Sequence, residues 1–426
     1  MDKKKCIIMI SATNYLKKSA GTEKFTRGLA DIYQKQDIDI VQVFPVSTFN
    51  NKLQSRLKKD IYYVGINYNG DFLGCYKQEK LNPALGYICH KYGVEYTGII
   101  VNQLLDYNLP VLVRTLKQLK LSIKVIVHDF SYICPYLQRK AGRGLECYKE
   151  LHLPDEISCG ACCFAADAIK DMEGLNAFFN VLNEQIEDII CPSQDTADAM
   201  GSLMPDIGEK LRVRPHLSYI EKPYREVIKD NGAKTDKLRI AFLGAANKAK
   251  GFGAWKKLHE EIPALYKYYY FGKTPDDFSL SNDEIVNVDF QDPEAPSMPA
   301  ALRDNKIDIA FIWSECRETY SYTLYEALEA GCFIITNDHS GNIKAVAGDG
   351  ISGKVFASLQ DSIDYMKDPD KVRQDIDKYR EEGMLPVDVD FNNDISLFEM
   401  HGKPQTLSYG KNCRNAMVTQ LYKAYI

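Results

Sequence analysis

The sequence lacks a long apolar run. No stretch approaches the ~20 apolar residues that a membrane-spanning helix needs, so we expect no transmembrane segment. The apolar stretch Ile7–Ile10 follows a basic start but is too short for the core of a signal peptide, and Lys17 and Lys18 stand where a small-residue cleavage site would lie. We therefore interpret this stretch as a first strand and expect a cytoplasmic protein.

A strong charge of one sign is also missing. The formal net charge is −5, which is too small to favour nucleic acid as a partner. Residues 1–215 hold 27 Lys+Arg and 25 Asp+Glu, which gives +2, and the remaining 26 and 33 give −7. A weakly basic N-terminal half fits peripheral contact at the inner face of the plasma membrane or an acidic acceptor. Scattered surface lysines explain it equally well, and the sequence predicts no oligomeric state.

What the sequence does contain is one α/β pattern repeated in its two halves. Short β-branched runs alternate with amphipathic helical stretches, which is typical of parallel sheets. The expected strands are Cys6–Ser11, Ile38–Pro45, Gly98–Asp106, Ile123–Asp129, Ile189–Pro192, Leu238–Leu243, Tyr266–Phe271, Ile285–Phe290, Ile307–Trp313 and Cys332–Thr336. Helices are expected at Thr22–Gln36 and Pro110–Leu119, among others. The pattern predicts an α/β fold of two Rossmann-like, doubly wound domains that share a ligand cleft beyond the carboxyl ends of their strands.

A break in this pattern suggests the domain boundary. Residues 215–237 contain Pro215, Pro223 and Asn231-Gly232 without a sustained period and are the best linker candidate. We therefore predict domains at 1–218 and 219–405, followed by a final helix at 406–426.

The most specific motif is a strand, loop and helix between residues 307 and 338. The helix is predicted to open at Glu318–Ser321, to pass Glu326 and to stop at Gly331. A helix N-terminus offers free N–H groups and a favourable dipole to a phosphate. At ~1.5 Å per residue, Glu318 and Glu326 would lie roughly 12 Å apart along the axis. This suits a nucleotide sugar, with hydroxyls at both ends of a diphosphate, although two glutamates at this spacing are also ordinary on a surface helix.

The segment ETYSYTLYEALEAGCFIITND, which carries both glutamates, resembles the acidic motif of retaining GT-B glycosyltransferases similar to glycosyltransferase family 4. The resemblance implies a GT-B architecture, in which two domains face a central cleft. It also implies that Glu318 binds hydroxyls of the transferred sugar, that Thr319 and Tyr320 hold the diphosphate through backbone amides, and that Glu326 binds the ribose.

A second segment, Phe242–Gly251, resembles the strand and loop of this family that end in Lys-Gly. The resemblance implies that Lys250 faces the donor diphosphate and that Gly244 belongs to the donor-binding loop. Ala245 stands where the family often has an arginine, and Lys248 is our candidate for the second positive charge. An ordinary solvated loop is the alternative interpretation.

The N-terminal half carries two weaker matches. Ser19–Glu23 resembles the Gly-rich first loop of the family, which places Gly21 near the donor, although a helix start capped by Thr22 fits equally well. His128-Asp129 matches a pair whose histidine faces the donor sugar in many relatives. His128 would then steady the reacting sugar, or it would simply satisfy a backbone carbonyl.

The resemblance implies catalysis that requires no cofactor or metal ion. The family retains the anomeric configuration without a protein nucleophile, and the donor phosphate accepts the proton of the acceptor hydroxyl. Lys250 and the helix terminus would stabilise the leaving diphosphate. No Asp-x-Asp motif stands out at the end of a strand, since Asp37-x-Asp39 precedes one and fits a turn. We therefore expect turnover to survive chelation.

Five of the twelve cysteines lie within thirty residues: Cys134, Cys147, Cys159, Cys162 and Cys163. Four thiolates that include one Cys-x2-Cys pair can close a tetrahedral zinc site. We predict a structural zinc held by Cys134, Cys147, Cys159 and Cys162 in an insertion at 130–165. Unpaired core cysteines are the alternative, and the seven other cysteines are expected to be reduced core residues.

The resemblance implies a function for the whole chain. It describes a retaining enzyme of the hexosyltransferase class that moves a hexose or deoxyhexose from a nucleotide-diphosphate sugar to a glycan or lipid-linked acceptor, in cell-surface polysaccharide biosynthesis. Residues 1–218 would be the acceptor domain and 219–405 the donor domain, with the 406–426 helix packed back on the first. A nucleotide-sugar 2-epimerase of the same fold and a catalytically silent sugar-nucleotide-binding protein are the alternatives.

Overall fold

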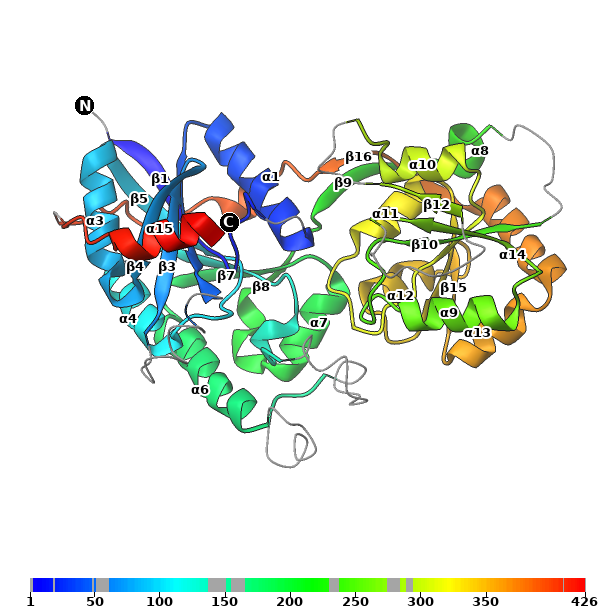
Figure 1. The fold of residues 1–426 in the computed structure, drawn as a ribbon, viewed down its shortest axis with the longest axis horizontal. Coiled ribbons are helices and arrows are strands. Elements are labelled where there is room, and N and C mark those ends of the chain that lie inside the picture. The colour runs from blue at the N-terminus through cyan, green and yellow to red at the C-terminus, as the bar shows by residue number, and fades with distance from the viewer. Residues whose placement is uncertain are drawn as a thin grey trace.

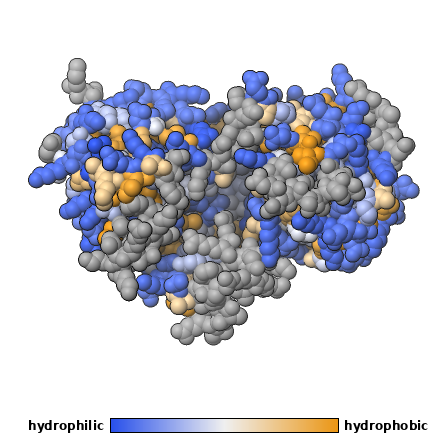
Figure 2. Space-filling model, viewed as in Figure 1, coloured by the Kyte–Doolittle hydropathy of each residue, from blue (hydrophilic) through white to orange (hydrophobic). Residues whose placement is uncertain are grey.

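The computed structural model describes residues 3–17, 20–47, 50, 61–136, 151–154, 165–229, 237–273, 284–288, 294–408 and 410–425. Two α/β lobes lie side by side, and the chain crosses between them in a narrow ribbon (Figure 1). In the described part of the chain, no helix is long and apolar enough to cross a membrane. On the face of the molecule that Figure 2 shows, most of the coloured residues are hydrophilic, and the surface is recessed between the two lobes.

The first lobe is built on an eight-stranded sheet in the order β4-β3-β2-β1-β5-β6-β7-β8. Its strands are β1 (Lys4–Ile10), β2 (Asp39–Pro45), β3 (Tyr63–Tyr68), β4 (Asp71–Lys77), β5 (Val94–Val101), β6 (Ile123–Ile126), β7 (Ile186–Cys191) and β8 (Leu211–Val213). Its helices are α1 (Gly21–Lys35), α3 (Leu81–Tyr92), α4 (Leu109–Leu119), α6 (Ala165–Val181) and α7 (Gln194–Leu203). Alternate residues of β1 enter two different cores, Ile8 on one face and Ile7 on the other. Burial on both faces explains why the strand is apolar throughout.

The second lobe has six parallel strands in the order β12-β11-β10-β13-β14-β15. They are β10 (Arg239–Leu243), β11 (Lys267–Phe271), β12 (Glu284–Val286), β13 (Ile309–Phe311), β14 (Phe333–Asn337) and β15 (Gly353–Phe356). The helices are α8 (Tyr224–Val227), α9 (Phe252–Glu261), α10 (Met298–Asp304), α11 (Tyr322–Glu329), α12 (Asn342–Ala347), α13 (Leu359–Met366) and α14 (Pro369–Glu382). In chain order the strands run 3-2-1-4-5-6, the Rossmann arrangement, so the strand order reverses between β10 and β13.

The candidate linker contains a strand that the sequence pattern did not predict. β9 (Leu217–Pro223) pairs antiparallel with β16 (Met384–Phe391), and the two strands form the ribbon between the lobes. A register shift lies between Val387 and Asp390, where Asp388 has a φ of 52°. Only Leu217 of β9 is buried. A strand exposed on both faces has no apolar period, which is why sequence periodicity missed it.

The segment 61–92, for which the sequence suggested no structure, forms the β3–β4 hairpin and α3. The hairpin turn is Asn69-Gly70, and both residues have positive φ, at 45° and 90°. Asn-Gly is the dipeptide that such a two-residue turn favours. This dipeptide was the feature of the sequence from which the hairpin could have been predicted.

The end of the chain returns to the first lobe. Phe398 packs in the core that holds Ile7, and Gln405 bridges to Tyr96, so this return begins before residue 405. The final helix, α15 (Ala416–Tyr425), begins ten residues later than the expected segment 406–426. It lies against β4, where the amide of Cys75 donates to Oγ1 of Thr419.

Candidate active site at the interface of the two lobes

Two loops of the second lobe meet where its strand order reverses. The loop after β10 begins at Gly244, with a φ of 92°, and ends at Gly251, with a φ of 80°. A Cβ at Gly251 would lie 1.8 Å from the carbonyl oxygen of Trp313, in the loop after β13. Only glycine permits this approach. The amide of Glu315 also donates to the carbonyl of Ala249 at 2.9 Å, so the two loops form one surface at the carboxyl ends of β10 and β13.

The prediction that a helix opens at Glu318 is wrong, because α11 begins only at Tyr322. The amide of Glu318 donates to the carbonyl of Ser340, and its carbonyl accepts from the amide of Asn342. The backbone of Glu318 is therefore paired with the loop after β14 and cannot enter the helix, so the estimate of roughly 12 Å from helical rise does not apply to residues 318–321. The N-cap residue of α11, Ser321, makes no side-chain cap hydrogen bond.

The carboxylate of Glu318 pairs with Lys250 across these loops. The Nζ atom of Lys250 lies 2.7 Å from Oε1 of Glu318, and Oγ of Ser314 donates to the same oxygen at 2.9 Å. Desolvation lowers the pKa of Lys250, but the Glu318 carboxylate outweighs it and raises that pKa overall. The structure thus brings together the predicted sugar-binding carboxylate and the predicted diphosphate-binding lysine. Lys248 is exposed on the same loop, and its carbonyl accepts from the amide of Gly251.

Glu326 faces the first lobe from the middle of α11. Its Oε1 lies 3.7 Å from Nζ of Lys24, which is on α1, and the Glu326 side chain is 25% exposed. The Lys24 ammonium also lies 4.5 Å from the ring centroid of Tyr322, the first residue of α11. Desolvation raises the pKa of Glu326, although Lys24 opposes this rise.

Gly21 is the first residue of α1, and its neighbour Ala20 is the N-cap, without a side-chain cap hydrogen bond. The alternative reading of Thr22 as the cap is therefore wrong. A Cβ at Gly21 would lie 3.5 Å from the ring of Tyr322, so the first turns of α1 and α11 face each other across the interface.

The segment before α11 is bonded directly to the first lobe. Oγ1 of Thr319 donates to the carbonyl of His128 at 2.6 Å, and Oγ of Ser193 donates to the carbonyl of Thr319 at 2.9 Å. Arg317 makes a bidentate ion pair with Asp195 of α7, with N···O distances of 2.6 and 3.0 Å. The loops after β6 and β7 therefore fix the position of residues 317–319.

His128 is half-buried at the interface. Its Nε2 lies 3.0 Å from Oδ1 of Asn102, and its ring is 5.0 Å from that of Phe25. Burial lowers the pKa of His128 to about 3, so the imidazole is neutral near pH 7. Its side chain can orient a polar ligand but does not carry charge there.

Sequence reasoning missed His216, which stands just before β9. Its ring contacts those of Phe25 at 4.4 Å, Tyr320 at 4.8 Å and Tyr322 at 5.9 Å, all between centroids. Burial holds its pKa well below the usual range. Tyr320 is buried against Tyr325, and its hydroxyl accepts from the amide of Leu217, so its side chain is a packing element at the ribbon. A lone histidine next to a proline gives no signal of such a place in the sequence.

The predicted zinc site is only partly described. Cys134 is buried in the core of the first lobe, while Cys147, Cys159, Cys162 and Cys163 lie outside the described residues. Within the ranges that the structure describes, no group of three or more His, Cys, Asp or Glu side chains is placed to hold a metal ion.

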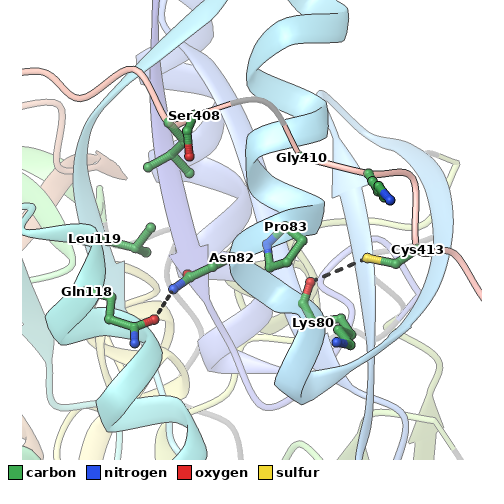
Figure 3. Close-up of a pocket in the computed structure, with 10 residues that line it drawn as sticks. Lys80, Asn82, Pro83, Gln118, Leu119, Ser408, Gly410 and Cys413 are labelled. Atoms are coloured by element: carbon green, nitrogen blue, oxygen red, sulfur yellow. Dashed lines mark hydrogen bonds between the residues drawn. The ribbon is translucent and has the colours of Figure 1, made fainter.

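A cavity of about 630 Å³ lies elsewhere, where the C-terminal segment passes α3 and α4 (Figure 3). Lys80, Asn82 and Gln118 line it together with Ser408 and Lys411. The amide of Asn82 donates to Oε1 of Gln118 at 2.8 Å, and Sγ of Cys413 donates to the carbonyl of Lys80. None of the candidate residues of the interface lines it.

No protein-family model and no curated protein matches the sequence. The structure, however, is similar to solved glycosyltransferases. A sucrose-phosphate synthase from Thermosynechococcus elongatus aligns with a TM-score of 0.56 and 13% identity over 89% of this chain and 94% of that one. HepE from Anabaena, in complex with UDP-glucose, aligns with a TM-score of 0.53 and 12% identity over 89% and 93%.

WaaG, a glycosyltransferase involved in lipopolysaccharide biosynthesis, aligns with a TM-score of 0.52 and 12% identity over 88% of this chain and 95% of that one. At these identities the likeness establishes the fold. It agrees with the two sheets, the Rossmann strand order and the loops that meet at the interface. The chain has the GT-B fold, with two Rossmann-like domains that face a central cleft.

Proposed function

We propose that this protein is a retaining glycosyltransferase of the hexosyltransferase class, which moves a hexose or deoxyhexose from a nucleotide-diphosphate sugar to a glycan or lipid-linked acceptor. The observation that carries the proposal is the pair of carboxylates, Glu318 and Glu326, at the strand-order reversal of the second sheet. Each faces a lysine, Lys250 and Lys24 respectively. Ligands of open α/β sheets bind at this place. HepE, a structural neighbour, was solved with UDP-glucose.

In the proposed complex, Glu326 accepts hydrogen bonds from the ribose and Glu318 from the transferred sugar. The diphosphate lies between them, against Lys250 and the first turn of α11, whose amides have no side-chain cap. Thr319 contributes its backbone amide, since its carbonyl and hydroxyl are already bonded to the first lobe. Gly21 lies opposite the first turn of α11, next to the ring of Tyr322.

The proposed reaction is a substitution at the anomeric carbon. The bond between that carbon and the diphosphate oxygen breaks, and the acceptor oxygen bonds to the same face. The acceptor proton passes to the departing diphosphate. Lys250 stabilises the charge that develops on the leaving oxygen. The neutral imidazole of His128 orients the sugar from the first lobe.

The proposed chemistry uses no metal ion, so turnover is expected to persist in excess EDTA. Activity that is lost on chelation and restored by Mn²⁺ or Mg²⁺ would contradict this. The structural zinc at Cys134, Cys147, Cys159 and Cys162 stays a separate prediction. Elemental analysis that finds less than about a tenth of an equivalent of zinc would reject it.

The test of the function is a panel of nucleotide sugars, scored first by binding and then by nucleotide release with candidate acceptors. NMR of the product should show the same anomeric configuration as in the donor. Glu326→Gln is expected to weaken donor binding by about 10- to 100-fold, because a charged acceptor is lost. Glu329→Gln, on the same helix, is the matched control.

Two outcomes would redirect the assignment. Conversion of the donor sugar without any acceptor would favour a nucleotide-sugar 2-epimerase. Binding without turnover for any acceptor would favour a silent sugar-nucleotide-binding protein. The acceptor, the cytoplasmic location and peripheral membrane contact stay predictions from the sequence.

A further inference from the structure

Few of the candidate residues that the sequence singled out are cations that could bind a diphosphate. Lys250 is already paired with Glu318 at 2.7 Å. Ala245 is uncharged, and Lys248 is exposed on the loop. A dianionic group that enters this site needs a further positive charge, because an anion next to two carboxylates is otherwise repelled.

Lys24 brings such a charge from the other lobe. It lies in the first turn of α1, and its side chain is 50% exposed. Its ammonium lies over the ring of Tyr322, at 4.5 Å from the centroid, and Tyr322 is the first residue of α11. The charge thus stands at the helix start against which the proposed diphosphate lies.

The ion pair between Lys24 and Glu326 is long. The distance from Nζ to Oε1 of Glu326 is 3.7 Å, beyond ordinary hydrogen-bond length. Glu326 is also the group proposed to bind the ribose. When the ribose hydroxyls hydrogen-bond to the Glu326 carboxylate, the Lys24 ammonium loses its counter-ion. The flexible Lys24 side chain can then reach the anionic diphosphate.

We propose that Lys24 is a diphosphate-binding residue, which pairs with Glu326 and moves to the diphosphate when the nucleotide binds. The inference rests on the proposed function and deepens it. It gives the second positive charge to a residue of the first lobe, in place of Lys248. Donor binding then links α1 to α11, because the second lobe holds the ribose and the sugar while Lys24 of the first lobe holds the diphosphate between them.

The test compares Lys24→Met with the wild type in calorimetric titrations against UDP, ADP and GDP and against the corresponding nucleosides. For the diphosphate that the wild type binds, we expect Lys24→Met to lose about 10- to 30-fold in affinity, as for one charge-assisted contact. The affinity for the nucleoside should stay equal or increase, since Glu326 is released. Lys24→Arg should keep most of the diphosphate affinity.

Lys35→Met is the matched control, because it removes the same charge from the exposed last turn of α1. Unchanged or tighter diphosphate binding by Lys24→Met would overturn the inference. It would mean that Lys24 only pairs with Glu326 and does not bind the diphosphate. If Lys24→Met loses the same affinity for the nucleoside as for the nucleoside diphosphate, the inference is also overturned, because the substitution then acts on the structure of the site and not on the diphosphate. Loss in Lys248→Met alone would return the role to that residue. A wild type that binds no nucleoside diphosphate overturns the proposed function itself.

Discussion

At the scale of single residues, the site pairs each carboxylate with a lysine. Lys250 and Glu318 come from two loops of one lobe, whereas Lys24 and Glu326 come from different lobes. The first pair is short, with an N···O distance of 2.7 Å, and the second is long, at 3.7 Å. The lysine of the short pair is the one we assign to the leaving group.

Lys250→Met is expected to lower kcat by about 100-fold or more, because one preorganised cation at the developing charge is lost. The fold should be unaffected, as the Lys250 side chain is 43% exposed. Steady-state kinetics with saturating donor measures this. Lys257→Met, on the exposed side of α9, is the control. A loss of less than about threefold would show that Lys250 has no part in the chemistry.

Two histidines at the interface, His128 and His216, predict how stability depends on pH. The pKa of His128 is about 3 in the folded protein, against ~6.5 in an unfolded chain. Between these values the unfolded chain binds a proton that the native one does not, so the free energy of unfolding falls as pH falls below about 6.5, by up to ~1.4 kcal/mol per pH unit. His216 acts in the same direction.

Urea unfolding at pH 7.5 and pH 5.5 checks this. The wild type should be less stable at the lower pH, and His128→Gln should show a smaller decrease. If the variant and the wild type lose the same free energy, the His128 imidazole is not kept neutral by the fold.

At the scale of elements, the close contact between the loops after β10 and β13 depends on one glycine. A Cβ at Gly251 would overlap the carbonyl of Trp313, at a φ that side chains rarely adopt. Gly251→Ala is therefore expected to lower the free energy of unfolding by more than ~2 kcal/mol and to abolish donor binding.

Gly253→Ala, two residues on, is the matched control. A Cβ there meets nothing within 4 Å, and the position lies in α9. Alanine in a helix favours stability by up to ~1 kcal/mol. Thermal unfolding of both variants should give shifts of opposite sign, and a harmless Gly251→Ala would contradict the proposed loop packing.

The sequence predicted elements well where both faces of a strand are buried. β1, β10 and β14 lie within one or two residues of the expected positions, since continuous apolar runs mark parallel strands. It failed for β9, which is exposed, and for the start of α11. That start depends on two backbone hydrogen bonds, one from the Glu318 amide to the Ser340 carbonyl and one from the Asn342 amide to the Glu318 carbonyl, and these partners are adjacent only in the folded chain.

The sequence singled out several residues of the candidate site, but it did not predict the contacts that they make in the folded chain. Spacing and resemblance singled out Glu318, Glu326 and Lys250, which the fold places in one region. They gave no hint of Lys24 or His216. Both belong to the site only because two lobes meet there, and no local pattern encodes that meeting.

At the scale of the whole molecule, the lobes are joined through the loop that carries the proposed sugar-binding group. The bidentate pair of Arg317 and Asp195 crosses the interface next to Glu318. Asp195→Asn should raise KM for the donor by about tenfold, because the 317–319 loop is no longer fixed. Small-angle scattering of the free protein should show a larger radius of gyration.

Asp198→Asn, on the same helix but exposed, is the control for this change. The thermal unfolding midpoint should move little in either variant, since each lobe keeps its own core. An unaltered KM and an unaltered radius in Asp195→Asn would mean that the ion pair does not set the distance between the lobes.

The β9–β16 ribbon has a mechanical consequence. Two antiparallel strands locked in register resist stretching and sliding, but they bend, and the irregularity at Asp388 marks a point where bending is easiest. The ribbon thus keeps the lobes connected, and a tilt of one lobe against the other would have to bend the ribbon and break the bonds of Arg317 and Thr319 to the first lobe. A single protease cut in either strand would leave the lobes covalently connected through the other strand, and only cuts in both would break the covalent connection between them.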